Sequence, residues 1–166
     1  MKINWLILLA ASIIPLVIGF VWYHPKVLGN AWKKASNLSD EQMSGANMAL
    51  IFGLTFLLSF FVAVAINFMV IHQFHLYSML ASEPGIKESG TEVNTLYTTI
   101  LEKYGMNFRT FKHGAFHGAI GGITLAFPIL AINALFERKG FTYIAINAGY
   151  WIICMALMGG VICAFS

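Results

Sequence analysis

Four stretches of this chain contain no Asp, Glu, Lys or Arg: residues 3–23, 48–71, 114–136 and 141–165. Each exceeds the ~18 apolar residues that suggest a bilayer span, and at about 1.5 Å per residue each crosses a hydrocarbon core of about 30 Å. In lipid, an isolated segment satisfies its backbone N–H and C=O groups only as a helix. The pattern therefore predicts an all-α, polytopic membrane protein with four transmembrane helices.

The composition agrees with this assignment. Charged residues make up 10% of the 166 residues, against about 25% in soluble domains. The net charge of +3 comes from basic residues in short loops that flank the apolar runs, where membrane topology and lipid headgroups account for them. We find no indication of a nucleic-acid partner.

We place the spans at about residues 3–23, 46–75, 113–136 and 141–165 and treat 1–166 as a single domain. The first apolar run, at about 21 residues, is longer than the ~7–15-residue core of a cleavable signal peptide, so we expect a retained helix.

Two residue patterns modify the ends and the course of these helices. Pro15 removes a backbone donor and predicts a bend in the first helix. Ser39 and Gln42 form a capping-box pattern, which predicts that the second helix begins near Asp40 and continues to about His75.

Two further helices are predicted outside the spans. The apolar residues of 26–36 recur at helical spacing beside Lys33 and Lys34, which indicates a short interfacial helix. Residues 77–111 form the only sizeable extramembrane segment. Within it, Thr91 can cap and Gly105 can end an amphipathic helix over about 92–104, lying either on the lipid surface or across the end of the bundle.

The basic residues divide evenly between the two sides of the membrane. One side, with both termini, has Lys2, Lys87, Lys103, Arg109 and Lys112, and the other has Lys26, Lys33, Lys34, Arg138 and Lys139. Because the positive-inside bias is strongest in short loops, the last two favour an orientation with the N-terminus and the C-terminus outside.

Four histidines are predicted to lie at one membrane surface. His72 and His75 end the second helix, and His113 and His117 begin the third, so the 77–111 segment brings both pairs to the same side. Such an arrangement can bind a transition metal, relay a proton or hold a haem or quinone. The alternative is that all four are interfacial side chains that reach water, and the sequence names no cofactor.

Buried amides form a second polar set. Asn67, Asn133 and Asn147 lie inside apolar runs, and Glu137 is one turn from Asn133. Hydrogen bonds between helices are the simplest account of such residues in lipid, and a polar permeation path is the alternative.

Small residues recur every four positions in the third helix, at Gly114, Gly118 and Gly122. This spacing allows a second helix to approach closely, within one chain or between copies.

Three functions are compatible with these features. We favour a non-enzymatic membrane subunit that self-associates or binds another membrane protein through its glycine faces, in a homo-oligomer or a larger complex. The alternatives are a small transporter or solute-binding protein using the asparagines, and a metal- or cofactor-binding protein using the four histidines. The sequence lacks a nucleophile elbow, a Walker loop and an HExxH motif, which argues against enzymes of those classes.

Three stretches carry a family resemblance: "WYHPKVLGNAW" (22–32), "NMALIFGLTFLL" (47–58) and "INALFERKGFTYIAINAGYWIICMALMGGVICAF" (132–165). Through them the chain resembles the small bacterial integral-membrane family catalogued as domain of unknown function 1761. The resemblance implies a protein of the bacterial cytoplasmic (inner) membrane. It assigns no activity and no functional residue.

Overall fold

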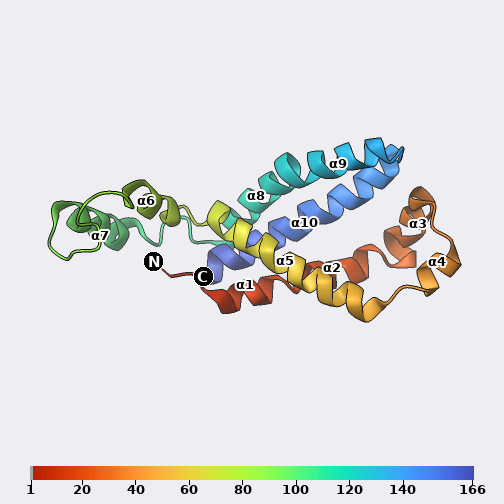
Figure 1. Cartoon of the computed structure of the whole chain (residues 1–166), viewed down its shortest axis with the longest axis horizontal. Coiled ribbons are helices and arrows are strands. Elements are labelled where there is room, and N and C mark those ends of the chain that lie inside the picture. Colours follow the sequence, from red (N-terminus) through yellow and green to blue (C-terminus); the bar gives the residue numbers. More distant parts are fainter. Residues whose placement is uncertain (1) are drawn as a thin grey trace.

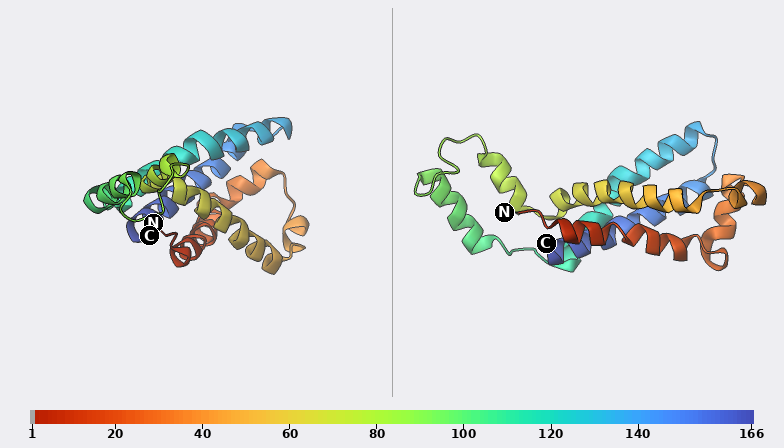
Figure 2. Two further views of the ribbon diagram at one scale, coloured as in Figure 1. Left: turned by 60° about the vertical axis from the view of Figure 1, so that its left-hand side comes forward. Right: turned by 60° about the horizontal axis from the view of Figure 1, so that its bottom comes forward.

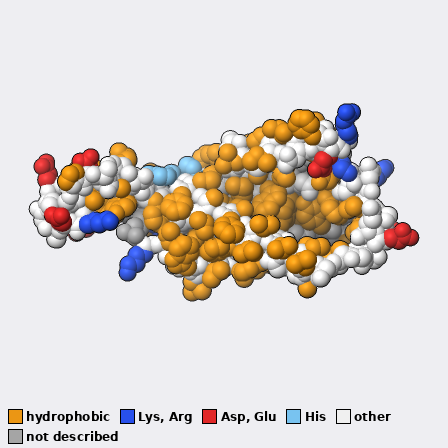
Figure 3. Space-filling model, viewed as in Figure 1, with side chains coloured by type: hydrophobic (Ala, Val, Ile, Leu, Met, Phe, Trp, Pro, Cys, Tyr) orange, Lys and Arg blue, Asp and Glu red, His pale blue; other side chains and the backbone are white. Residues whose placement is uncertain are grey.

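The computed structural model describes residues 2–166, and its regular structure is entirely helical. Four helices are long and apolar enough to cross a membrane: Trp5–Trp22, Met48–Val70, Phe111–Phe136 and Phe141–Phe165. They form one elongated bundle (Figure 1), and Figure 3 shows hydrophobic side chains over most of its visible face. The predicted fold class and the predicted number of spans are confirmed.

The first span is broken just before its proline. Helix α1 (Trp5–Ala11) ends at a turn, and α2 (Ile14–Trp22) begins with Pro15 in its first turn. Ser12 Oγ donates a hydrogen bond of 2.7 Å to Leu8 O and so satisfies this buried hydroxyl. Because proline fits only the first turn of a helix without losing a hydrogen bond, the predicted bend takes the form of two helices in series.

The loop after α2 contains the predicted interfacial helix. A short π-helical turn, η1 (Pro25–Gly29), leads directly into α3 (Asn30–Ser36). The capping box also forms, with Ser39 and Gln42 exchanging hydrogen bonds at the start of α4 (Asp40–Ser44).

The second span is shorter than the sequence predicts. A helix begins at Asp40 as predicted, but the expectation that it continues unbroken to about His75 is wrong, because α4 stops at Ser44 and Asn47 caps a new helix, α5 (Met48–Val70). At the far end Ile71 adopts extended dihedral angles (φ −107°, ψ 90°), and α6 (Gln73–Leu80) then continues in another direction. The predicted span of 46–75 is therefore corrected to Met48–Val70.

The third span contains a π-helical turn. Helix α8 (Phe111–Gly121) passes through η2 (Gly122–Ala126) into α9 (Phe127–Phe136). A tight turn then leads into α10 (Phe141–Phe165), which packs most extensively against α8. In α10, 50% of the most apolar stretch is buried, against 17–22% in the other spans, so α10 is the central helix of the bundle.

The hydrophobic core lies where α1, α5 and α10 meet. Its buried members are Leu8, Ala11, Ala63, Ile66, Val70, Ile71, Met155, Met158, Ile162 and Cys163. This places the core toward the end of the bundle at which both termini lie (Figure 1).

Helices α6 and α7 form an arm that leaves the bundle at that same end. Helix α7 (Glu92–Tyr104) has the predicted bounds, and Thr91 Oγ1 caps it by accepting from Asn94 N. The helix packs on α6, with the rings of Tyr77 and Tyr97 5.8 Å apart. Figure 2 shows both helices projecting away from the bundle, so α7 does not lie across the bundle end.

Candidate metal centre

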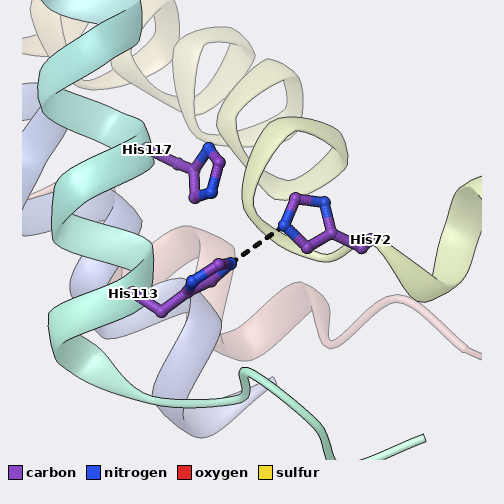
Figure 4. Close-up of side chains that lie close together, drawn as sticks. All are labelled: His72, His113 and His117. Atoms are coloured by element: carbon purple, nitrogen blue, oxygen red, sulfur yellow. Dashed lines mark hydrogen bonds between the residues drawn. The ribbon is translucent and has the colours of Figure 1, made fainter. Parts of the chain in front are cut away.

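Three of the four predicted histidines meet at the root of the arm. His72 lies between α5 and α6, and His113 and His117 lie one turn apart on α8 (Figure 4). One ring nitrogen from each of the three lies within 4.8 Å of the other two. The closest pair is Nε2 of His72 and Nε2 of His113, 2.9 Å apart. The helix break at Ile71 and the start of α8 thus bring imidazoles from two separate segments to one point.

The fourth predicted ligand, His75, lies outside this group and is exposed. The sequence predicts that His72 and His75 lie close together at the end of one straight helix continuous with α5. Because the chain changes direction at Ile71, His72 faces α8 while His75 belongs to the arm.

Close packing of α8 on α10 fixes the position of the two α8 histidines. A Cβ at Gly114 or at Gly118 would collide with the backbone of α10, at Gly159 and Met155 respectively. These glycines therefore form the contact face of α8. His113 and His117 each precede one of them, about 100° around the helix, which places their rings on the flank toward His72.

The same contacts account for the glycine ladder. Gly114, Gly118 and Gly122 all lie against α10, the last with a Cβ position 2.7 Å from Ile152 Cα. Within this chain the ladder therefore serves internal packing, and it does not offer a free face to a second copy.

A residue that sequence reasoning missed, Phe108, borders the histidines. Its ring centroid is 5.0 Å from that of His113 and 6.5 Å from that of His72. Its φ of +63° lies in the left-handed region, which a bulky side chain rarely adopts. Such strained positions cluster at functional sites, but nothing in the local sequence indicates a left-handed phenylalanine.

Neighbouring polar contacts hold the root of the arm against the bundle. Gln73 Nε2 donates to Asn107 O at 2.9 Å, which joins the two chain segments that enter the arm. Arg109 donates from Nε to Cys163 O at 3.2 Å and from its guanidinium to Ser166 O, at the carboxyl end of α10. The histidines therefore lie on a frame tied to the central helix.

The protonation state of the cluster suits metal binding. The hydrogen bond between His72 and His113 requires one Nε2 to donate and the other to accept, so the two neutral rings take opposite tautomers, and the donating ring must shift its proton to Nδ1 before its Nε2 can bind a metal. Burial, followed by the neighbouring His117, His113 and His75, lowers the pKa of His72 below its ordinary value. This ring is therefore neutral at neutral pH, the form that coordinates a metal.

The donor spacing fits a small transition metal. Two nitrogens at about 2.0–2.1 Å from a tetrahedral zinc ion are roughly 3.3 Å apart. A metal would therefore require the 2.9 Å pair to open slightly and any wider separation, all being within 4.8 Å, to close. No carboxylate of residues 2–166 belongs to the group.

The structure does not bring the predicted asparagines together. Asn67 is fully buried, and neither its amide nitrogen nor its amide oxygen has a partner within the described chain. Asn147 accepts from Tyr23 Oη at 3.0 Å and donates to Tyr143 O at 2.8 Å. Asn133 is exposed on α9, as is Glu137 just beyond it. A polar layer formed by all three amides is therefore absent from residues 2–166.

Comparison with known proteins adds a family and nothing further. A family model described as "Protein of unknown function (DUF1761)" matches residues 6–163. The chain belongs to this family. Neither the curated proteins nor the solved structures give a match. Membership of the family confirms the resemblance found in the sequence, and the functional argument rests on the geometry of the histidines.

Proposed function

We propose that this protein is a membrane-embedded metal-binding protein that holds a divalent transition metal of the zinc class on His72, His113 and His117. The observation that carries the proposal is the convergence of three imidazole nitrogens, from two separate segments, within 4.8 Å. Imidazole ligands suit Zn²⁺, Cu²⁺, Ni²⁺ and Fe²⁺, whereas Mg²⁺ and Ca²⁺ prefer oxygen ligands. The absence of a carboxylate from the group favours the first class.

Three protein ligands leave a fourth tetrahedral position open for water or another small ligand. Because imidazole is a neutral ligand, a bound ion would keep its full double positive charge, which favours an anionic fourth ligand such as hydroxide. Figure 3 shows histidine side chains at the surface where the arm leaves the bundle, so an ion can enter without opening the helices. This arrangement supports binding and exchange of an ion and requires no substrate pocket.

The proposal takes the place of the function favoured from the sequence, self-association, and of one of its two alternatives, transport. Self-association would need an exposed glycine face, and Gly114, Gly118 and Gly122 do not provide one because they pack on α10. Transport along a layer of asparagines is not supported, because the three asparagines form no such layer: Asn67 and Asn147 have different surroundings and Asn133 is exposed.

We further propose a bacterial cytoplasmic membrane with the N-terminus and the C-terminus outside. The support is the position of Arg138 and Lys139 in the shortest loop, which the positive-inside rule places in the cytoplasm. In this orientation the histidines and the arm face the external side, and the metal is acquired from there.

Metal content of the purified full chain tests the proposal. Protein prepared without a polyhistidine tag and dialysed against Zn²⁺ is expected to retain one equivalent by elemental analysis. Co²⁺ in its place is expected to give the intense visible absorption of a tetrahedral site. His113→Gln removes a ligand and lowers the affinity by at least about 100-fold, whereas the matched variant His75→Gln leaves it unchanged.

Two outcomes would contradict the proposal. One is retention of well under one equivalent by the wild-type chain in the presence of excess Zn²⁺. The other is an equal loss of metal from His113→Gln and His75→Gln, which would indicate non-specific binding to surface imidazoles.

A further inference from the structure

A cavity of about 510 Å³ lies between α3 and the turn that joins α9 to α10. This is the opposite end of the bundle from the histidines (Figure 1). Its lining includes the polar residues Lys34, Asn37, Arg138, Lys139 and Thr142, together with Tyr143. A volume in this range is typical of small-ligand sites, and nothing in the proposed metal function uses it.

The cavity has an uncompensated positive charge. Lys34, Arg138 and Lys139 all line it, and no acidic residue does. Among residues 2–166 the only ion pair joins Lys33 to Asp40, so none of the three cations is neutralised by a carboxylate. Three positive charges around one cavity favour an anionic ligand.

The backbone adds further donors. Helix α10 begins after Gly140, whose lack of a side chain leaves the first turn without a side-chain cap. The N–H groups of Phe141 and Thr142, which as first-turn groups have no intrahelical acceptor, are thus left uncapped, and they carry the positive end of the helix dipole. Gly140 and Thr142 both line the cavity, so this end of α10 faces the same space as the cations.

Arg138 occupies a position that folding alone would give to glycine. Helix α9 ends in a Schellman motif, in which Lys139 N donates to Ala134 O at 2.8 Å and Arg138 N donates to Leu135 O at 3.1 Å. The motif requires a left-handed residue, and Arg138 has φ +58°. At the corresponding end of α3 the left-handed residue is Asn37, a common choice there. An arginine at such a site is unfavourable for the backbone, and what it provides is a guanidinium at the mouth of the cavity.

Lys139 is held in place across the cavity. Its Nζ donates to Ser36 O at 2.7 Å and lies 5.7 Å from the centroid of the Tyr143 ring. This bond links the end of α3 to the α9–α10 turn and fixes the ammonium group at the cavity wall, so part of the cation cluster is ordered before any ligand binds.

We propose that this cavity binds an anionic phosphate group, which Lys34, Arg138, Lys139 and the first turn of α10 contact. On this side the four spans have their ends at Trp22, Met48, Phe136 and Phe141, so the cavity lies at the depth of lipid headgroups. The phosphate belongs either to an acidic phospholipid headgroup or to a small soluble phosphate. The two sources share one recognition chemistry.

Thermal unfolding of the full chain in an uncharged detergent separates these sources. Phosphatidylglycerol is expected to raise the midpoint by about 5–10 °C relative to the same amount of phosphatidylcholine. If inorganic phosphate at millimolar concentration, added alone, gives the same rise, the ligand is soluble phosphate and the site is supported. An unchanged midpoint with phosphate assigns the site to the lipid headgroup.

The decisive variant combines Lys34→Gln, Arg138→Asn and Lys139→Gln, where asparagine keeps the tolerance for a left-handed backbone. It is expected to fold in phosphatidylcholine and, measured against its own midpoint there, to lose the rise in phosphatidylglycerol. The control combines Lys26→Gln, Lys87→Gln and Lys103→Gln, which remove the same charge outside the cavity.

An equal response of the wild type to phosphatidylglycerol and phosphatidylcholine, without a response to phosphate, overturns the proposal. So does an equal loss in the control, which would show a general surface-charge effect. If the cavity variant does not fold, native mass spectrometry of the wild type decides the question, since one retained phosphatidylglycerol per chain is expected and none would refute the site. Neither result bears on the metal site at the other end.

Discussion

The contact between α8 and α10 yields a quantitative prediction. A Cβ at Gly118 would lie 2.7 Å from the carbonyl carbon of Met155 and 3.0 Å from Ala156 Cα, and closer still to Met155 O. Carbon atoms normally approach to about 3.5–4.0 Å, so Gly118→Ala requires the two helices to separate by about 0.8 Å. A gap of this size forfeits a quarter to a half of the dispersion energy at the contact.

The expected net effect follows from two opposing contributions. Overpacking a close contact costs about 1–3 kcal/mol, and backbone atoms on both sides place this case at the upper end. Alanine recovers about 0.5–1 kcal/mol over glycine from helix propensity, which leaves a destabilisation of about 2 kcal/mol. Gly53→Ala is the matched control, because a Cβ there meets nothing within 4 Å on α5, and it should stabilise by about 0.5–1 kcal/mol.

Thermal unfolding in one detergent, followed by tryptophan fluorescence, measures both variants. Their midpoints should differ by roughly 6–12 °C, since about 3 kcal/mol separates them. Gly118→Ala should also weaken Zn²⁺ binding, because it displaces the helix that holds His117. Equal midpoints for the two variants would refute the reasoning and show that the glycine ladder is not a contact face within the monomer.

Three further predictions concern the buried amides, the histidines and the orientation in the membrane. Asn67→Leu should raise the free energy of unfolding by about 1–3 kcal/mol, because it removes a buried amide without partners. Asn147→Leu should lower it by a similar amount, because it breaks two hydrogen bonds. A destabilised Asn67→Leu protein would indicate a bound water or ligand at the amide. Zn²⁺ binding should be constant from pH 8 to 7 and fall only below the ordinary histidine pKa of about 6.5. The reason is that the lowered pKa of His72 keeps its ring neutral until protons compete with the metal at lower pH. A loss of binding that begins above pH 7 would contradict this. Cysteines introduced at Gly90 and at Asn37 should react with an impermeant maleimide from opposite sides of the membrane, the cysteine at position 90 from outside. The reverse pattern would overturn the proposed orientation.

The sequence predicts those features that depend on the surrounding solvent or on a local hydrogen bond. The four spans follow from the absence of charge, because lipid excludes charged side chains wherever they lie in the chain. The capping box at Ser39 and the cap of α7 at Thr91 each depend on residues within three positions, and both form as expected.

Features that depend on packing between distant segments were predicted less well. No Gly or Pro marks the break at Ile71, which lies within the buried core, and the misplacement of His75 follows from it. The partner of Asn147 is a tyrosine 124 positions away, which spacing along one helix cannot indicate. The histidines were found because two short-range pairs were each visible in the sequence, and only the crossing of α5 and α8 decided which three converge.

A metal held by His72 and His113, as proposed above, would also cross-link the two ends of the arm. The two residues are 41 positions apart, and the whole arm lies between them. By the chain-entropy relation used for disulfides, a link across a loop of this length removes about 4 kcal/mol of conformational freedom from the open chain. A metal bridging these imidazoles would clamp both ends of the loop at once, and its removal would free α6 and α7 to separate from each other while the four spans stayed assembled. If the site binds metal as proposed, the order of the arm would depend on the occupancy of the three histidines at its base.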